Sequence, residues 1–319
     1  MKTRILSALA AAFALSLPAV AQEYPTKQIT FIVPFAAGSA TDQLARALGQ
    51  SVAEQVKHPV LVDNKPGASG FLAAQQAAKS PADGYTVLIT TNTTHAANEH
   101  LYKSMPYDPV KDFAPVTLLG KGGQIMIVNP KVEAKTVGEF VALAKKQPGK
   151  LSFGSGSSSS RIAGELLQQM AGIEILHVPY KSNPLAITDL LGGQIDMMIT
   201  DTATGIPQVQ AGKVRALGVT AAKRIALAPD VPTISEAGVK GYEMGYWFAA
   251  YVPAKTPPAV VQKLRTALVA ATKAPAAIKF YESTGVDPVV SSPEELASFQ
   301  TAESQKWGRI IKAAKITPE

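Results

Sequence analysis

Short apolar runs alternate along this chain with stretches whose apolar residues recur at helical spacing. The run at 28–33, QITFIV, precedes a loop of small residues, and after Thr41 apolar residues occupy positions 44, 45, 48 and 52. The first pattern predicts a strand over 28–33, and the second predicts a helix over about 41–57. Further apolar runs predict strands at 59–62, 85–90, 114–119, 124–128, 151–153, 175–178, 195–200, 214–220 and 244–252.

The segments between these strands carry the signals that start and stop helices. Thr136 and Ser292 each stand three residues before a glutamate, which is the spacing of a capping box. Helices are predicted at about 71–79, 136–148, 161–170 and 183–192, and through most of the tail after Pro258. Strands that alternate with helices in this way predict an α/β fold on a largely parallel sheet.

The strand–helix alternation runs through two successive series, and no low-complexity linker divides them. A chain of 319 residues is long enough for two lobes that each bury a core. We therefore predict two lobes connected by strands, with a cleft between them. The crossings between the lobes are expected near Gly123 and near Trp247.

Two loops of small residues follow predicted strands and lead into predicted helices. A helix N-terminus leaves backbone N–H groups without intrahelical acceptors, and the helix dipole adds partial positive charge, so such loops attract anions. The first loop consists of Phe35, Ala36, Ala37, Gly38, Ser39, Ala40, Thr41 and Asp42. The second consists of Ser155, Gly156, Ser157, Ser158, Ser159, Ser160 and Arg161. Arg161, at the end of the second loop, either adds a charge-assisted bond to a carboxylate or is a solvated residue. Two such loops, far apart in sequence, predict a clamp around an anion.

Further polar residues are expected beside these loops, because ligands of parallel sheets bind at the carboxyl ends of the strands. Thr91, Asn92 and His95 follow the strand at 85–90 and are expected to add polar contacts. Asp201 ends the strand at 195–200 and is expected either to hold a loop or to receive the far end of a ligand. Asp42 and Asp201 also leave an acid–base pair open, although a charge at a helix N-terminus explains Asp42 better.

The N-terminus has the pattern of an export signal. Lys2 and Arg4 precede the apolar residues 5–17, and residues 18–21 end in a small-x-small pattern. This predicts a cleaved signal peptide over 1–21; the apolar run is short for a membrane anchor. The chain contains no cysteine, which excludes disulfides, zinc thiolates and thiol nucleophiles. The mature protein is therefore expected to be periplasmic.

Charge and motif content remove several other classes of function. The net charge is +7, but the basic residues are scattered and aromatic residues make up 7% of the chain, so no nucleic-acid partner is expected. The four histidines have no metal-ligand spacing with nearby carboxylates. Neither a complete dinucleotide fingerprint nor a P-loop lysine occurs in the two loops. We expect no metal and no cofactor.

The serine cluster at 155–160 leaves a periplasmic hydrolase open as the alternative. The order Gly154-Ser155-Gly156 does not form a G-x-S-x-G nucleophile elbow, and no convincing Ser–His–Asp series accompanies it. His177 lies within a predicted strand and is expected to be structural. A scaffold or adhesion protein is a third class, which would show no stabilisation by a ligand.

Eight segments in a characteristic order carry a family resemblance. They are VPFAAGSATD at 33–42, NKPGASG at 64–70, PADGYT at 81–86, FGSG at 153–156, HVPYK at 177–181, DLLGGQID at 189–196, APDVPT at 228–233 and EAG at 236–238. Through this order and spacing, the mature chain resembles the substrate-binding proteins of tripartite tricarboxylate transporters, of the Bordetella-uptake-gene (Bug, or TctC-like) type.

The resemblance implies a two-lobed type II periplasmic binding-protein fold with a two-strand hinge. The first lobe would comprise 22–122 and 249–319, and the second 123–248. It also implies a monomeric receptor, not an enzyme, that binds a small carboxylate through loops 35–42 and 155–160. The ligand would be a di- or tricarboxylate or an aromatic carboxylate, and the receptor would deliver it to a membrane permease. The second loop departs from the family's usual G-S-x-G-x-G-S-x-x-H, because it has extra serines and Arg161 in place of the histidine.

Overall fold

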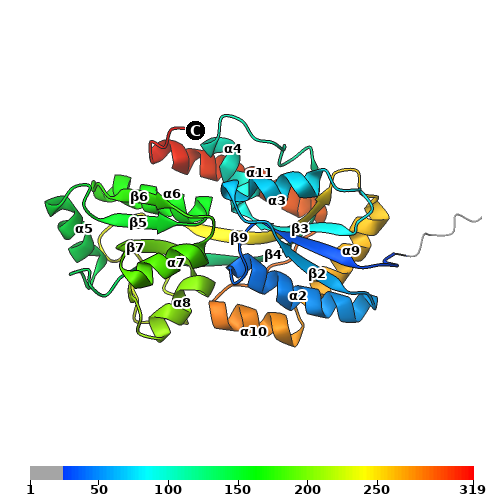
Figure 1. The fold of residues 1–319 in the computed structure, drawn as a ribbon, viewed down its shortest axis with the longest axis horizontal. Helices are drawn as coiled ribbons and strands as arrows, with labels where there is room; N and C mark the ends of the chain where they lie inside the picture. Colours follow the sequence, from blue (N-terminus) through cyan, green and yellow to red (C-terminus); the bar gives the residue numbers. More distant parts are fainter. Residues whose placement is uncertain (1–23) are drawn as a thin grey trace, which may run out of the picture.

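The computed structural model describes residues 24–319, so the predicted signal peptide at 1–21 lies outside the described residues. Figure 1 shows two lobes side by side, each built on a sheet with helices on both faces. The strands are β1 (Ile29–Val33), β2 (Val60–Asn64), β3 (Thr86–Thr91), β4 (Phe113–Val128), β5 (Ser152–Ser155), β6 (Leu176–Pro179), β7 (Met197–Asp201), β8 (Arg215–Val219) and β9 (Gly245–Pro253). We call the part built on β1, β2, β3 and β9 the first lobe, and the part built on β5 to β8 the second lobe.

The helices follow the predicted positions closely in most of the chain. They are α2 (Ala40–Val56), α3 (Phe71–Ala78), α4 (Asn98–Leu101), α5 (Val137–Lys146), α6 (Ser158–Ala171), α7 (Asn183–Gly192), α8 (Thr202–Gln210), α9 (Pro258–Ala271), α10 (Pro275–Thr284) and α11 (Pro293–Ala313). The short 3₁₀ turn η1 (Ala68–Gly70) and the π-helix η2 (Thr93–Ala97) complete the elements. Ser292 forms the predicted capping box with Glu295 at the start of α11.

The strand order is β2-β1-β3-β9-β4-β7-β5-β6, with β8 also paired to β4. Within each lobe the pairing is parallel as predicted: β1 with β2 and β3, and β5 with β6 and β7. The pairs that β4 and β9 make are antiparallel, which the alternation of strands and helices did not indicate. The α/β class is confirmed, and the joining strands account for the mixed sheet.

β4 is one strand of 16 residues, so the prediction of two strands separated by 120–123 was wrong. The glycines of that segment stay in the ladder because β9 pairs with them, from Gly120 opposite Phe248 to Gly123 opposite Gly245. The register shifts between Leu118 and Gly120, where a side chain on Gly120 would crowd Val286. A glycine run therefore allows a long strand to bend while it passes from one lobe to the other.

The chain crosses between the lobes at two adjacent points. β4 pairs with β9 up to Gly123 and with β7 from Gln124 onwards, and the return crossing enters β9 at Gly245. Thr220 ties the two crossings together. Its Oγ1 accepts a hydrogen bond from the N–H of Gln124 at 2.8 Å and lies 2.8 Å from the carbonyl oxygen of Met244.

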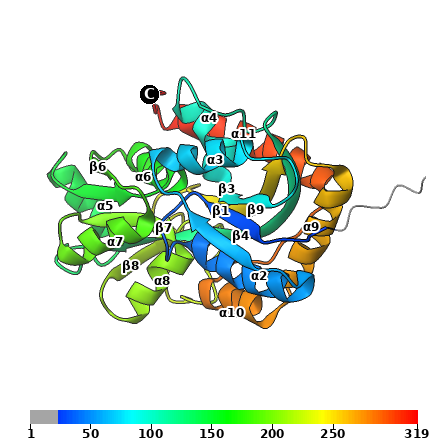
Figure 2. The same ribbon diagram turned by 45° about the vertical axis from the view of Figure 1, so that its right-hand side comes forward.

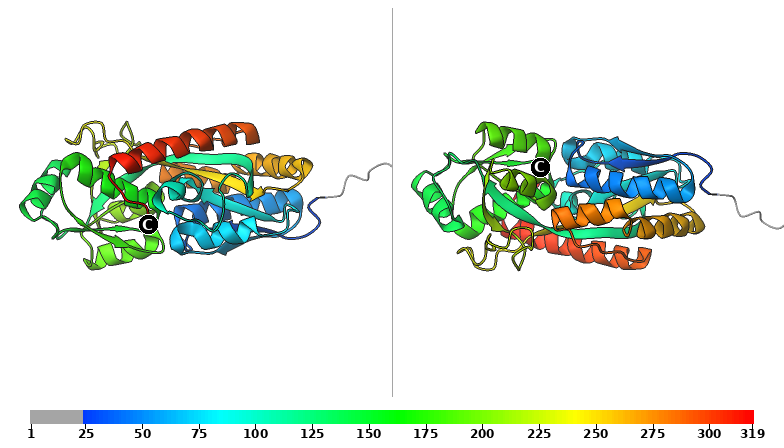
Figure 3. Two further views of the ribbon diagram at one scale, coloured as in Figure 1. Left: turned by 90° about the horizontal axis from the view of Figure 1, so that it is seen from above. Right: turned by 90° about the horizontal axis from the view of Figure 1, so that it is seen from below.

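The C-terminal helices complete the first lobe. α9 and α10 pack with α2 on one face of its sheet, while α3, α4 and α11 cover the other face (Figure 2). α11 runs along the first lobe and reaches α6 of the second (Figure 3). Within 24–319, no helix is both long and apolar enough to cross a membrane.

Candidate functional site

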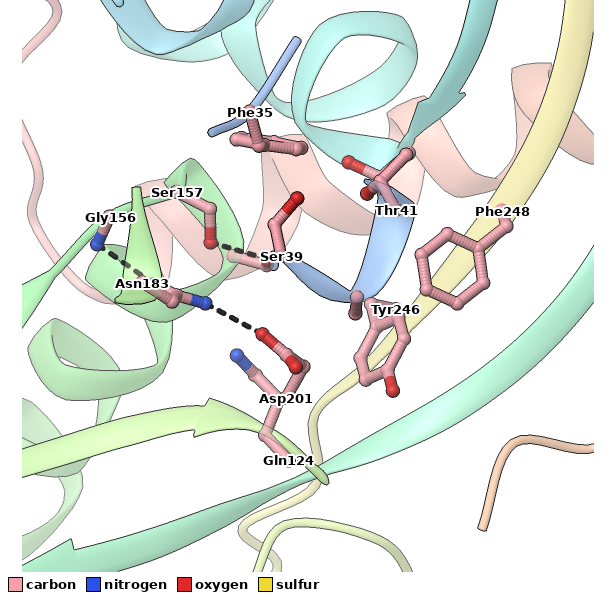
Figure 4. A pocket seen from close by; sticks show the side chains of 13 residues that line it. Phe35, Ser39, Thr41, Gln124, Gly156, Ser157, Asn183, Asp201, Tyr246 and Phe248 are labelled. Carbon is pink, nitrogen blue, oxygen red and sulfur yellow. Dashed lines mark hydrogen bonds between the residues drawn. The ribbon is translucent and has the colours of Figure 1, made fainter. Parts of the chain in front are cut away.

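A pocket lies where the ends of strands from both lobes meet, and Figure 4 shows its lining. The empty space inside it is about 380 Å³, which includes space open to solvent. Nine of the predicted site residues line it: Phe35, Ser39, Ala40, Thr41, Thr91, Gly156, Ser157, Ser159 and Asp201. The lining also includes four residues that were not predicted, namely Gln124, Asn183, Tyr246 and Phe248. The pocket thus combines both predicted loops with residues of the crossing strands β4 and β9.

Ten predicted site residues lie outside this lining. They are Ala36, Ala37, Gly38, Asp42, Asn92, His95, Ser155, Ser158, Ser160 and Arg161. Most of those with polar side chains have partners within the protein. Ser158 Oγ donates to Asn98 Oδ1 of the first lobe at 2.8 Å, and Ser160 Oγ donates to the carbonyl oxygen of Ile199.

The N-termini of α2 and α6 face the pocket from different lobes. Ser39 caps α2 by accepting from the N–H of Asp42 at 3.3 Å, and Ser157 caps α6 by accepting from the N–H of Ser160 at 3.2 Å. Within 24–319, no hydrogen bond engages the backbone N–H groups of Ala40, Thr41, Ser158 or Ser159. Each helix therefore presents donors and a positive dipole end to the space between the lobes.

Asp42 shapes the first loop from behind the pocket. Its carboxylate accepts from the N–H of Gly38 at 2.9 Å and from Asn64 Nδ2 at 3.0 Å, and it pairs with Arg46. Asn64 also donates to the carbonyl oxygen of Phe35 at 2.9 Å. These bonds fix the loop conformation, with Gly38 in the left-handed region at φ 82°. The position of Asp42 gives no support to an acid–base pair with Asp201.

Two more helix N-termini meet in the second lobe, and Asn183 joins them to the α6 loop. Asn183, at the start of α7, accepts from the N–H of Gly156 at 2.9 Å and donates to Asp201 Oδ2 at 2.8 Å. Asp201 caps α8, because its Oδ1 accepts from the N–H of Thr204 at 2.8 Å. This chain of bonds holds the α6, α7 and α8 termini in a fixed mutual arrangement.

The pocket lining contains one carboxylate, that of Asp201, and no lysine, arginine or histidine. Burial, and then the nearby charge of Asp201, raise the pKa of Tyr246 above its ordinary value, so the phenol stays protonated. The positive potential at this site therefore comes from helix termini and neutral donors, not from basic side chains. Among residues 24–319, no cluster of acidic, histidine or cysteine side chains has the composition of a metal site.

His95 lies in the core behind the pocket. Its ring stacks on Tyr251 with centroids 3.9 Å apart, and its Nδ1 is 2.8 Å from Thr94 Oγ1. Burial lowers the pKa of His95 to about 3. The ring is neutral at physiological pH and acts as a packing residue.

We expect acidification to destabilise the protein through His95. Its pKa is about 3 in the folded chain and about 6.5 when unfolded, so between these values the unfolded chain binds the additional proton. The stability that the neutral ring provides is therefore present above pH 6.5 and falls by about 2 kcal/mol by pH 5. Urea denaturation at pH 7 and pH 5 measures the loss. An NMR titration of the imidazole C2–H with a midpoint near 6.5 would contradict the prediction.

The four lining residues that were not predicted had no local sequence signal for a ligand contact. Three of them lie in the crossing strands β4 and β9, where the sequence pattern does not distinguish them from other strand residues: Gln124, Tyr246 and Phe248. Asn183 stands before Pro184 and was assigned only as a helix start. The crossings predicted near Gly123 and near Trp247 were the only indications that these strand residues would lie at the cleft.

Comparison with known proteins gives consistent relatives over almost the entire chain. The model of the "Tripartite tricarboxylate transporter family receptor" matches residues 44–316. Protein BugT of Bordetella pertussis is 30% identical over 316 residues, which span 97% of each chain.

Two solved structures are similar to the fold described here. One, titled R. palustris Rpa4515 with adipate, superposes with a TM-score of 0.90 at 35% identity, covering 93% of this chain and 100% of that one. The other is MatC (Rpa3494) from Rhodopseudomonas palustris with bound malate, with a TM-score of 0.86 at 29% identity, covering 90% of this chain and 100% of that one. The two-lobed binding-protein fold is confirmed, and the chain belongs to the family of tripartite tricarboxylate transporter receptors of the Bug type.

Proposed function

We propose that this protein is a periplasmic receptor that captures a small carboxylate between its lobes and delivers it to the membrane permease of a tripartite tricarboxylate-type transporter. The observation that carries the proposal is the pair of helix N-termini, α2 and α6, that face one pocket from different lobes. Their unengaged N–H groups form a site for an anion. Among the similar solved structures, Rpa4515 is described with adipate and MatC with bound malate, and both ligands are carboxylates.

The proposed mechanism is closure of the lobes about the two crossings. The first lobe is taken as 22–122 with 249–319 and the second as 123–248. A ligand carboxylate held by Ala40 and Thr41 on one side and by Ser159 on the other would contact both lobes only when they are closed. Binding would therefore favour the closed state by its differential affinity for it. Export through the signal at 1–21 and a monomeric state remain part of the proposal.

A matched pair of variants tests the anion site. Ala40 lines the pocket whereas Ala37 is exposed, so Ala40→Leu is expected to fill the site and Ala37→Leu to leave it open. With a panel of di-, tri- and aromatic carboxylates, a bound ligand at a hundredfold excess over its Kd should stabilise the wild type by about 2.7 kcal/mol. The melting temperature of wild type and Ala37→Leu should rise by about 5 °C, and that of Ala40→Leu should not. If no carboxylate raises the melting temperature of the wild type, the proposed ligand class is wrong.

An ion pair between the lobes should support closure. Arg161 of α6 pairs with Glu319 at 2.7 Å, and Glu319 is anchored to the first lobe by backbone bonds to Leu101 and Lys103. Arg161→Ala is expected to weaken ligand binding two- to fivefold, because a partly exposed pair contributes about 0.5–1 kcal/mol. Calorimetry at low and high salt measures the effect, which salt should diminish in the wild type. Lys111→Ala, at a pair within the first lobe, should leave binding unchanged; equal losses in both variants would rule out a role for the interlobe pair.

A hydrolase is the second candidate because Ser155 Oγ lies 2.7 Å from His177 Nε2, the contact that a nucleophile–base pair requires. Burial and then the charge of Arg161 lower the pKa of His177 to about 4, which makes the ring a weak base at neutral pH. Within the described chain, no carboxylate is hydrogen-bonded to His177 to orient it. Turnover of nitrophenyl esters that Ser155→Ala abolishes would establish the hydrolase; its absence, together with carboxylate binding, favours the receptor.

A further inference from the structure

Gln124 occupies a distinctive position in the pocket. It stands directly opposite Asp201 in the β4–β7 register, at the point where β4 enters the second lobe. Cross-strand neighbours carry their side chains on the same face, and Figure 4 shows the Gln124 amide beside the Asp201 carboxylate. The residue is 1% exposed and lines the pocket, yet its Oε1 has no hydrogen-bond partner among residues 24–319.

The side-chain amide of Gln124 is not needed to hold the strand. Its backbone N–H donates to Thr220 Oγ1 at 2.8 Å, and its carbonyl oxygen accepts from the N–H of Thr220 at 2.9 Å. The backbone hydrogen-bonding groups of Gln124 are thus satisfied without its side chain. A buried acceptor without a partner is unfavourable, so a donor on a bound molecule that reached Oε1 would stabilise the complex.

Asp201 determines how the side-chain amide of Gln124 is oriented. Both of its oxygens already accept hydrogen bonds, Oδ1 from Thr204 and Oδ2 from Asn183. A carboxylate is an acceptor only, so a second acceptor turned toward it would be repelled. The amide nitrogen of Gln124 is therefore favoured on the side of Asp201, and the amide oxygen on the side away from that carboxylate.

The two ends of the pocket consequently differ in chemistry. The α2 and α6 termini supply donors and positive potential, whereas the end at Asp201 and Gln124 supplies a carboxylate and an unengaged amide oxygen. No basic side chain lines either end. A second ligand carboxylate at the Asp201 end would face a like charge at short range, while a hydroxyl, amine or amide N–H would find an acceptor.

We infer that Gln124 is a specificity-determining residue, and that the ligand is a carboxylate whose distal end bears a hydrogen-bond donor. This inference rests on the proposed receptor function and narrows its ligand class. The donor bonds to Gln124 Oε1, beside Asp201.

The test is a matched ligand series measured by calorimetry. For chain lengths of three to six carbons, each length supplies an ω-hydroxy acid, an ω-amide acid, the dicarboxylate and the unsubstituted monocarboxylate. For the length that fits best, the hydroxy or amide acid is expected to bind at least about tenfold tighter than the dicarboxylate and the unsubstituted acid. A dicarboxylate that binds the wild type most tightly would overturn the inference.

Two variants at position 124 and one control elsewhere test whether Gln124 acts as an acceptor or as a donor. Gln124→Met keeps the size but removes the acceptor, so the preference for the donor-bearing ligand should fall about tenfold. Gln124→Glu keeps an acceptor, so binding of the hydroxy acid should persist while the dicarboxylate binds still more weakly. Gln262→Met, on the exposed face of α9, is the control and should change nothing. Circular dichroism and melting curves verify that each variant is folded.

The outcomes distinguish this inference from the proposed function. If carboxylates bind but Gln124→Met retains the wild-type selectivity, the role of Gln124 is wrong and the receptor proposal stands. If Gln124→Glu loses the hydroxy acid, Gln124 acts as a donor and the inference is again overturned. If neither this series nor di-, tri- and aromatic carboxylates bind to the wild type, the receptor proposal fails. The inference, which rests on that proposal, then fails as well.

Discussion

Replacing Gly156 with alanine is expected to abolish ligand binding and to lower the free energy of unfolding by about 3 kcal/mol. A Cβ atom on Gly156 would overlap the backbone of Ser182 and Asn183, and backbone atoms cannot move aside as a flexible side chain can. Relief of the overlap requires α7 to move away from the loop before α6. The bond from the Gly156 N–H to Asn183 Oδ1 would break, and the α6 terminus would lose its place opposite α2.

Urea denaturation and calorimetry with a bound carboxylate measure both losses at position 156. Gly192→Ala is the matched control, because Gly192 is exposed at the end of α7 and a Cβ there meets only Gln194 at 3.9 Å. That variant should be neutral or slightly stabilising, since alanine is the better helix former. Wild-type stability and affinity in Gly156→Ala would mean that the close approach of loop and helix does not constrain the site.

The parts of the fold that the sequence predicted are those with local signals. Period-2 and period-3.6 patterns located the strands and most helices, and the cap at Ser292 marked the start of α11. β4 was missed as a single strand because its glycines resemble a loop until they are paired with β9, more than a hundred residues away. α8 was missed because it is a helix of nine residues with Pro207 inside it, and its stability depends on the Asp201 cap.

In the candidate site, too, the features with a local sequence pattern were predicted and those set by tertiary packing were not. The loops that follow β1 and β5 could be identified because small residues between a strand and a helix are a local pattern. Which side chains of a loop enter the pocket is a tertiary property: Ser39 and Thr41 do, whereas Asp42 turns back to bind Gly38 and Asn64. His95 is likewise placed by its packing on Tyr251, and a histidine after a strand has no signal that distinguishes core from rim.

Asp201→Ala is expected to lower the free energy of unfolding by about 3–4 kcal/mol. Loss of an N-cap acceptor accounts for about 1–2 kcal/mol, because the Thr204 N–H at the start of α8 loses its partner. The buried Nδ2 of Asn183 also loses its acceptor, which adds about 1–3 kcal/mol. These contributions share one network, so they are not fully additive.

Asp201→Asn separates the cap from the charge. The amide oxygen of asparagine can still cap α8, but its NH₂ group would face Nδ2 of Asn183, so a loss of only about 1–2 kcal/mol is expected. Asp230→Ala, at an exposed position outside the pocket, should stay within about 0.5 kcal/mol of the wild type. If Asp201→Ala also remained within about 1 kcal/mol, the cap and the Asn183 bond would be minor contributions.

Ligand binding in the position 201 variants tests whether Asp201 does more than hold the fold. Asn183 links Asp201 to the N–H of Gly156, so both substitutions should loosen the α6 terminus and weaken carboxylate binding. Asp201→Asn also removes the negative charge at the distal end of the pocket. Its affinity for a dicarboxylate should therefore fall less than its affinity for the hydroxy acid of the same length, because the repulsion of a second carboxylate is gone. Equal losses for the two ligands, measured by calorimetry, would mean that the charge of Asp201 does not discriminate between them.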